Sequence, residues 1–186
     1  IIYEKSKKLT ELINIFHEYS KLEHPDFNLI FEKVDLSEYL RAYIALKYED
    51  IVESGFNIEV DIPEEEMEIK IDKVQLQRVF DNILGNSIKH NEKGTNIYVS
   101  LKEKNDIYEI IIADDGKGIS KDIANNIFEA FTVGDESRNS KQGSGLGLAI
   151  AKTIVDLHGG TIELEPESLK KFSTQFKIIL KKNPKL

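Results

Sequence analysis

Apolar residues recur at intervals of three and four over long segments of the chain, which is the spacing of one helix face. Helical patterns of this kind occupy residues 1–24, 35–54 and 72–90. Asp35 and Asp72 stand where N-cap residues are expected, and Pro25 ends the first segment. A further apolar stretch at residues 149–155 predicts a fourth helix.

Shorter apolar or alternating segments predict strands at residues 57–62, 67–71, 96–101, 108–113, 161–165 and 174–180. The third and fourth of these segments form a predicted hairpin across residues 103–106. Strands and helices mixed in this order predict an α/β (α+β) fold, a two-layer sandwich of one mixed β-sheet covered on one face by helices. We expect an N-terminal helix and linker over residues 1–25, followed by a compact domain over residues 34–186.

Residues 143–148 read Gly-Ser-Gly-Leu-Gly-Leu and lead directly into the fourth predicted helix. Alternate glycines let the backbone approach a ligand closely. The first turn of a helix offers unpaired N–H groups and a partial positive charge, which suit phosphate. The spacing fits neither the P-loop nor the Rossmann pattern. The run is either a phosphate-binding loop or a loop that needs flexibility alone.

An aspartate followed by two glycines comes directly after the predicted strand at 108–113. Asp114 could accept a hydrogen bond from an exocyclic amine, while Gly116 and Gly118 leave room for a flat ring. The alternative interpretation is an ordinary turn that leaves a strand.

Four polar residues of the 72–90 helix share one edge: Asn82, Asn86, Lys89 and His90. An asparagine offers a neutral oxygen to hydrated Mg²⁺, and a lysine supplies a point charge for phosphate oxygens. The alternative is an amphipathic helix whose polar side simply faces water.

Four segments in sequence resemble the boxes of a known family. Residues 82–89, 114–118, 127–131 and 143–148 are similar to the N, G1, F and G2 boxes of sensor histidine kinases, which belong to the GHKL superfamily of ATP-binding proteins. The resemblance covers residues 34–181 and includes His158-Gly159-Gly160, where the histidine ends a helix and is favoured by the helix dipole. It implies the GHKL ATP-binding fold, and it makes residues 1–25 part of the second helix of a dimerisation hairpin with its linker.

The resemblance also implies ATP and Mg²⁺ as cofactors and assigns roles at the site. Asn86 holds Mg²⁺ and is catalytic together with Lys89, while Asp114 selects adenine. His90 stands where the family often has an aromatic residue, which favours packing or a contact with the nucleotide edge. The complete set of expected ATP-binding residues is Asn82, Asn86, Lys89, His90, Asp114, Gly116, Gly118, Ile119, Phe128, Phe131, Arg138, Lys141, Gly143, Ser144, Gly145, Leu146, Gly147 and Leu148.

A polar stretch without periodicity at residues 132–142 is expected to form a lid, because such stretches inside compact domains are functional or disordered. Phe128 and Phe131 anchor its start. Arg138 and Lys141 are the candidates for a phosphate contact, the alternative being that both are solvated lid charges.

The residues present favour transfer of phosphate over hydrolysis. ATP-hydrolysing members of the superfamily carry a glutamate where this chain has Asn82, and an amide is a poor general base. Asp81 is turned about 100° around the helix and should point elsewhere. The implied acceptor is a histidine on a dimerisation helix upstream of Ile1. His17 is rejected because it lies in the segment that matches the second helix.

The resemblance thus implies a protein-histidine kinase domain whose partners are the acceptor-histidine helix of the same homodimer and a response regulator. Three alternatives stay open: a GHKL-type ATPase, a serine kinase of the anti-sigma type, and a nucleotide-gated binding module that transfers nothing.

Composition narrows the range of partners. The net charge is −8 and no basic run exceeds short lysine pairs, so we expect neither nucleic acid nor a membrane surface as a partner. The chain has no cysteine, which excludes disulfides and thiolate chemistry. No apolar stretch approaches ~20 residues, the length that spans a bilayer. Because the chain begins at Ile1 within a helical pattern, we expect a cytoplasmic fragment of a longer protein that can itself be anchored in a membrane.

Overall fold

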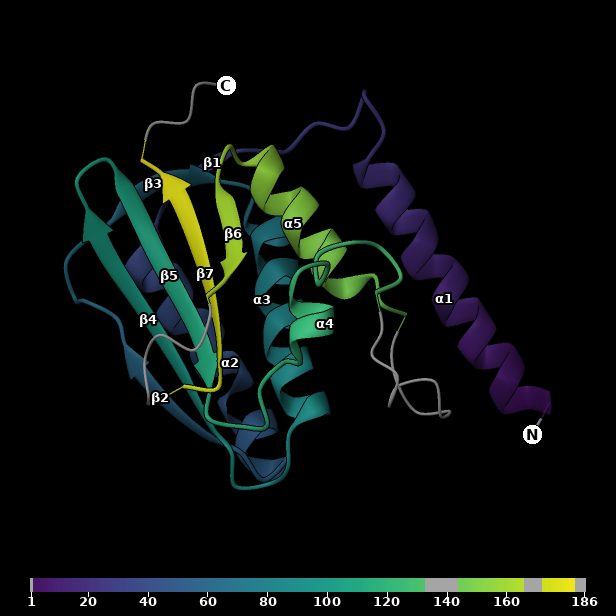
Figure 1. Ribbon diagram of the computed structural model, residues 1–186. Helices are drawn as coiled ribbons and strands as arrows, with labels where there is room; N and C mark the ends of the chain where they lie inside the picture. The colour runs from purple at the N-terminus through teal and green to yellow at the C-terminus, as the bar shows by residue number, and fades with distance from the viewer. Residues whose placement is uncertain (1, 133–143, 166–171, 183–186) are drawn as a thin grey trace.

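The computed structural model describes residues 2–132, 144–165 and 172–182 (Figure 1). Its helices are α1 (Ile2–Leu22), α2 (Leu36–Glu53), α3 (Lys73–His90), α4 (Lys121–Ala124) and α5 (Gly147–Leu157). Its strands are β1 (Glu32–Asp35), β2 (Asn57–Asp61), β3 (Glu68–Ile71), β4 (Asn96–Lys104), β5 (Ile107–Asp114), β6 (Thr161–Leu164) and β7 (Thr174–Lys181).

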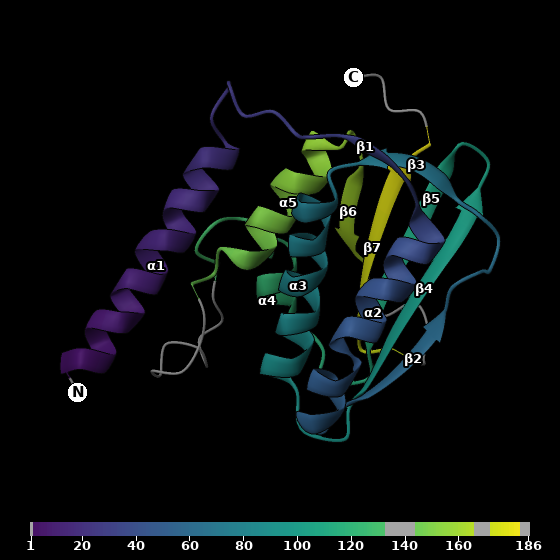
Figure 2. The same ribbon diagram turned by 180° about the vertical axis from the view of Figure 1, so that it is seen from behind.

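Five strands form one mixed sheet in the order β2-β4-β5-β7-β6. Strands β2 and β4 are parallel, and the other neighbours are antiparallel. Helices α2, α3 and α5 cover one face of this sheet, as Figures 1 and 2 show from opposite sides. The expected two-layer sandwich is therefore confirmed.

The structure adds a second, two-stranded sheet to the expected architecture. Strand β3 pairs with β1 in it, antiparallel. The sequence analysis missed β1, because the four residues Glu-Lys-Val-Asp contain a single apolar side chain and show no useful alternation. The small sheet fixes the start of α2, since Leu36 N–H donates to the Met67 carbonyl over 2.8 Å.

The core lies between the sheet and its helices. Alternate residues of β4, β5 and β7 point toward the helices and are almost fully buried: Ile97, Val99, Leu101, Ile110, Ile112, Ile178 and Leu180. Leu76, Phe80 and Ile83 of α3 meet them and are fully buried as well. This burial fixes how α3 is rotated about its axis, and therefore which of its side chains remain available for other contacts.

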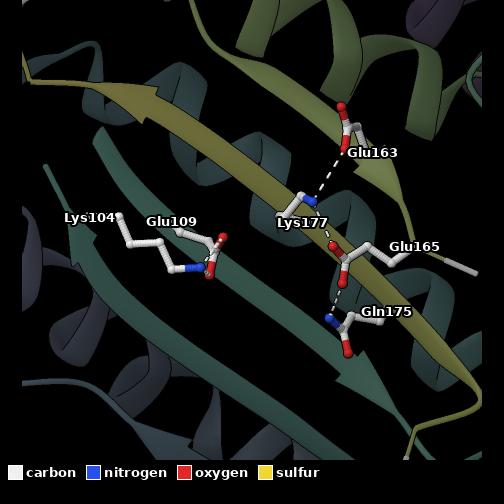
Figure 3. Close-up of polar contacts among 6 residues, drawn as sticks. All are labelled: Lys104, Glu109, Glu163, Glu165, Gln175 and Lys177. Atoms are coloured by element: carbon white, nitrogen blue, oxygen red, sulfur yellow. Dashed lines mark hydrogen bonds and ion pairs between the residues drawn. The ribbon is translucent and has the colours of Figure 1, made fainter. Parts of the chain in front are cut away.

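The opposite face of the sheet carries several charged pairs (Figure 3). Lys177 on β7 reaches both Glu165 (2.6 Å) and Glu163 (3.4 Å). These contacts raise the pKa of Lys177, with the hydrogen bond to Glu165 as the largest cause. Lys104 and Glu109 pair across the β4–β5 hairpin at 2.7 Å.

Helix α1 ends at Leu22, two residues before the predicted end, and lies beside α5 (Figure 2). Glu18 forms an ion pair with Arg78 of α3 at 2.9 Å. Further along, Thr153 of α5 donates to Glu23, just beyond the end of α1, over 3.0 Å. No helix among the described residues is long and apolar enough to cross a membrane.

Candidate active site

Helix α3 begins in a buried polar cluster. Asp72 caps the helix by accepting the Gln75 N–H at 3.0 Å, as the sequence predicted. Its other carboxylate oxygen accepts the Ile30 N–H of the linker at 2.9 Å. The backbone N–H of Asp72 donates to Nε2 of His158 at 3.1 Å. The linker, the start of α3 and the end of α5 therefore meet at a single residue, Asp72.

His158 is buried and neutral in this arrangement. Because Nε2 accepts a hydrogen bond, the ring proton lies on Nδ1, which donates to the Ile154 carbonyl at 2.7 Å. Burial lowers the pKa of His158, outweighing the raising effects of the Ile154 carbonyl and Asp72. The residue does end the helix as expected. The helix dipole does not leave His158 charged, because Nε2 accepts a hydrogen bond and therefore carries no proton.

The polar edge predicted for α3 exists. Asn82, Asn86 and His90 are half-buried, and Lys89 is exposed. Among the described residues the Asn86 amide has no hydrogen-bond partner, which leaves its oxygen available to a ligand. The pKa of His90 is lowered, first by burial and then by the positive charges of Lys89 and Lys117. His90 is therefore neutral at pH 7 and not a phosphate-binding cation.

Asp81 turns away from this edge, as expected. Its Oδ1 accepts the Tyr43 hydroxyl at 2.9 Å and pairs with Lys47 at 2.9 Å, both from α2. Burial and the nearby Asp81 raise the pKa of Tyr43, so its hydroxyl keeps its proton and donates it. A carboxylate held in this way is poorly placed to activate a water at the Asn82 position.

Asp114 ends β5 and is 2% exposed. Its Oδ2 accepts the hydroxyl of Ser87 at 2.8 Å, and its Oδ1 accepts the Gly116 N–H at 3.2 Å. Sequence reasoning missed Ser87. A signal was present: Ser87 continues the core-facing series of Phe80, Ile83 and Leu84 on α3, where a polar residue must have a polar partner.

The loop after Asp114 is attached to the end of α3 by Asn91, which was also missed. Asn91 donates to the Ser87 carbonyl at 3.0 Å and accepts the Lys117 N–H at 3.0 Å. A Cβ atom on Gly116 would overlap the Asn91 amide. The space beside Gly116 thus holds a protein side chain and not the open gap that was expected. Gly118 has a φ of +76°, which requires glycine.

The second glycine loop meets the F-box residues and α3. Gly145 has a φ of +68°, and its carbonyl accepts the Phe131 N–H at 2.9 Å. A Cβ atom on Gly147 would lie 2.8 Å from Oδ1 of Asn82, so the missing side chain lets α3 and α5 approach. Ser144 accepts the Leu146 N–H at 3.2 Å. These contacts place Asn82 beside the first turn of α5.

The remaining expected residues divide into four groups. Ile119 and Phe128 are half-buried, and Phe128 packs edge-on against Phe176. Phe131 is 60% exposed, and its ring lies 6.3 Å from that of Phe16 on α1. Leu146 and Leu148 are buried in the core. Arg138, Lys141, Gly143 and nearly all of the expected lid lie outside the described residues.

A small cavity of about 170 Å³ lies where α1, α3 and α5 meet. Ile15 and Glu18 line it from α1, Arg78 and Asn82 from α3, and Gly147 from α5. The cavity thus touches three of the residues expected to contact ATP: Asn82, Ser144 and Gly147.

Comparison with known proteins identifies the family. Residues 71–184 match the family described as histidine kinase-, DNA gyrase B-, and HSP90-like ATPase. The chain belongs to this ATPase family. The expected resemblance to a GHKL ATP-binding domain is thereby confirmed. The sensor histidine kinase YcbM of Bacillus subtilis (strain 168) is 32% identical over 180 residues, which is 96% of this chain and 57% of that protein.

Solved structures of histidine kinases share the fold of this ATPase-family chain. Full-length ShkA in complex with AMPPNP has a TM-score of 0.76 at 24% identity, covering 95% of this chain and 36% of that one. ThkA in complex with the response regulator protein TrrA has a TM-score of 0.74 at 23% identity, covering 99% of this chain and 50% of that one. The chain spans 31% and 57% of the lengths of two curated relatives that it matches.

Proposed function

We propose that this chain is the ATP-binding catalytic domain of a sensor histidine kinase. In the proposed reaction it holds ATP with Mg²⁺, and the γ-phosphoryl group passes to a histidine of an upstream dimerisation helix. The observation that carries the proposal is the contact of α3 with both glycine loops, through Asn91 beside Gly116 and Asn82 beside Gly147. One helix thereby brings the three expected ligand-binding segments together.

Each segment has a chemistry that suits one part of ATP. The buried Asp114 carboxylate accepts the exocyclic amine of adenine. The N-terminus of α5, with Gly145 and Gly147 before and within its first turn, suits phosphate. Asn86 and Lys89 lie between these positions along α3 and face the phosphates in our proposal.

Mg²⁺ fits this donor set as an ion that the protein and the nucleotide bind together. Among the described residues no group of three or more histidines, aspartates and glutamates could hold a metal. Mg²⁺ usually keeps several waters and binds through few protein ligands together with substrate phosphates. One Asn86 oxygen with phosphate oxygens and water is such an arrangement, and the bound ion would neutralise phosphate charge.

The protein groups favour transfer to a protein acceptor. Phosphoryl transfer needs positioning and charge neutralisation more than covalent help. Asn82 cannot serve as a general base, and Asp81 is held by Tyr43 and Lys47. No described carboxylate is thus assigned to activate water at this site.

We propose that the partners are a second copy of the parent protein and a response regulator. The response-regulator complex of ThkA, which has the same fold, supports the latter. Exposed Leu9, Ile13 and Phe16 on α1 support the former, because a row of apolar side chains on a helix suits packing against other helices.

The deciding experiment restores the upstream helix and supplies γ-labelled ATP with Mg²⁺. We expect acid-labile, base-stable label on the protein, which is the signature of phosphohistidine. Acid-stable label would indicate a serine kinase. Steady phosphate release without label would indicate an ATPase, and intact ATP throughout would indicate a binding module. Each of these three results would overturn the proposal.

A further inference from the structure

We propose that Ser87 is a positioning residue that sets the base specificity of the site. It does so by fixing the Asp114 carboxylate as an acceptor for an amino group. The inference rests on the proposed function, because it concerns the same nucleotide site. It adds a residue that neither the glycine loops nor the asparagine edge of α3 contains.

The Ser87 hydroxyl acts as a hydrogen-bond donor to Asp114. Ser87 is 4% exposed, and its Oγ lies 2.8 Å from Oδ2 of Asp114. An ionised carboxylate has no proton to donate, so the hydroxyl must donate. Its only proton is therefore committed to Asp114.

A second hydrogen bond, from Gly116, also fixes the orientation of the Asp114 carboxylate. Gly116 donates its N–H to Oδ1, and Asn91 holds this loop against α3. Both oxygens of Asp114 thus accept hydrogen bonds from the protein, which fixes the plane of the carboxylate. With its lone pairs held in that plane, the group can accept a further bond from a ligand but repels a ligand oxygen.

Adenine and hypoxanthine differ at the position that this carboxylate would contact. Adenine carries an amine there, which donates. Hypoxanthine carries a carbonyl, which brings two acceptors together in a buried site without a shared proton. Sites built to hydrogen-bond one polar group can reject its mismatched analogue strongly, because buried groups are left unpaired. Discrimination of this kind requires a carboxylate that cannot turn away, and Ser87 supplies that constraint.

The test compares ATP and inosine triphosphate binding to the 186-residue chain and its variants, by displacement of a fluorescent nucleotide. The Ser87 bond to a charged group is of a strength that corresponds to roughly 10-fold in an equilibrium constant, which sets the scale for losing the fixed orientation of Asp114. We expect Ser87→Ala to lose about that factor for ATP and little for inosine triphosphate. Their affinity ratio then falls by about 10-fold. The ratio is taken within one preparation, so a smaller folded fraction does not change it.

Two further variants separate positioning from general packing. Ser87→Thr keeps the hydroxyl and is expected to keep the wild-type ratio. Ser37→Ala removes a fully buried hydroxyl that has no hydrogen-bond partner within the described part of the chain, and it is expected to leave the ratio unchanged.

The outcomes distinguish the inference from the proposed function. Wild-type chain that binds neither nucleotide would overturn both. Wild-type selectivity for ATP with an unchanged ratio in Ser87→Ala, or equal loss for both nucleotides, would overturn the role of Ser87 alone. Loss of the ratio in Ser37→Ala would also overturn it, because the effect would then belong to packing.

Discussion

The two ends of helix α3 differ from its middle. At the first end Asp72 binds the linker, its own helix and His158. At the last end Ser87 and Asn91 bind Asp114 and the loop that follows it. Between them, a Cβ atom on Gly85 would meet nothing within 4 Å, and the Asn86 amide has no hydrogen-bond partner among the described residues.

This difference separates scaffold from ligand site. Buried polar groups in folded proteins are almost always hydrogen-bonded, and both ends of α3 obey that rule. A half-buried amide without a protein partner, beside an open space, is where a ligand can add contacts without breaking any. We therefore expect Asn86 to act by binding a ligand directly, whereas the groups at the two ends act through the protein contacts that they hold.

The largest expected effect is on the middle of the helix. Asn86→Ala should abolish the Mg²⁺-dependent part of ATP affinity, because it removes the proposed metal ligand. Calorimetric titration with and without Mg²⁺ measures this effect. Asn14→Ala, at an exposed position of α1, is the matched control and should bind like the wild type. Unchanged Mg²⁺ dependence in Asn86→Ala would contradict the assignment.

A change at the C-terminal end of α3 should lower the free energy of unfolding. Gly116→Ala forces a methyl group into the Asn91 amide, and overpacking of this kind costs about 1–3 kcal/mol. Urea unfolding would measure the loss in the free energy of unfolding. A variant as stable as the wild type would show that Asn91 can move without cost.

The contacts at the N-terminal end of α3 should make the free energy of unfolding depend on pH. Burial lowers the pKa of His158 below its ordinary 6.5, so the unfolded chain binds more protons in the window just below that value. The free energy of unfolding should not be reduced by this group above pH 6.5. It should fall as the pH drops below that value, by at most about 1.4 kcal/mol per pH unit for His158.

Unfolding curves between pH 5 and 8 would test this dependence. His90 contributes with the same sign, since its pKa is also lowered. His158→Gln should have a shallower pH dependence than the wild type. His17→Gln, at an exposed position of α1, should keep the full slope. Identical slopes in all three proteins would contradict the neutral, buried imidazole.

The smallest expected effect is for a change in the middle of α3. Gly85→Ala should raise the free energy of unfolding by roughly 0.5–1 kcal/mol, because alanine restricts the unfolded chain more and nothing obstructs its methyl group. The same exchange thus has opposite signs at Gly85 and Gly116. A loss of ATP affinity in Gly85→Ala, without a loss of stability, would place the nucleotide or a partner helix in that space.

Sequence patterns located the four longer helices well, because α2 and α3 carry aspartate caps and apolar stripes that act locally, but they did not predict the four-residue α4. They missed β1, whose pairing with β3 crosses more than thirty residues of chain. They also missed Ser87 and Asn91, because the partners of these side chains lie more than twenty residues away. The charge state of His158 depends on burial and on the distant Asp72, which local patterns do not encode.

Strand β7 has a consequence for the order in which this domain can assemble. It is the last strand of the described chain, yet it lies between β5 and β6, and β6 has no other partner in the sheet (Figure 1). Ser173, just before β7, also donates its N–H to the Asp114 carbonyl over 2.9 Å. During synthesis, β7 up to residue 181 must therefore emerge from the ribosome before the sheet can be completed. A product that stops short of β7 would expose two unpaired strand edges, which are templates for aggregation.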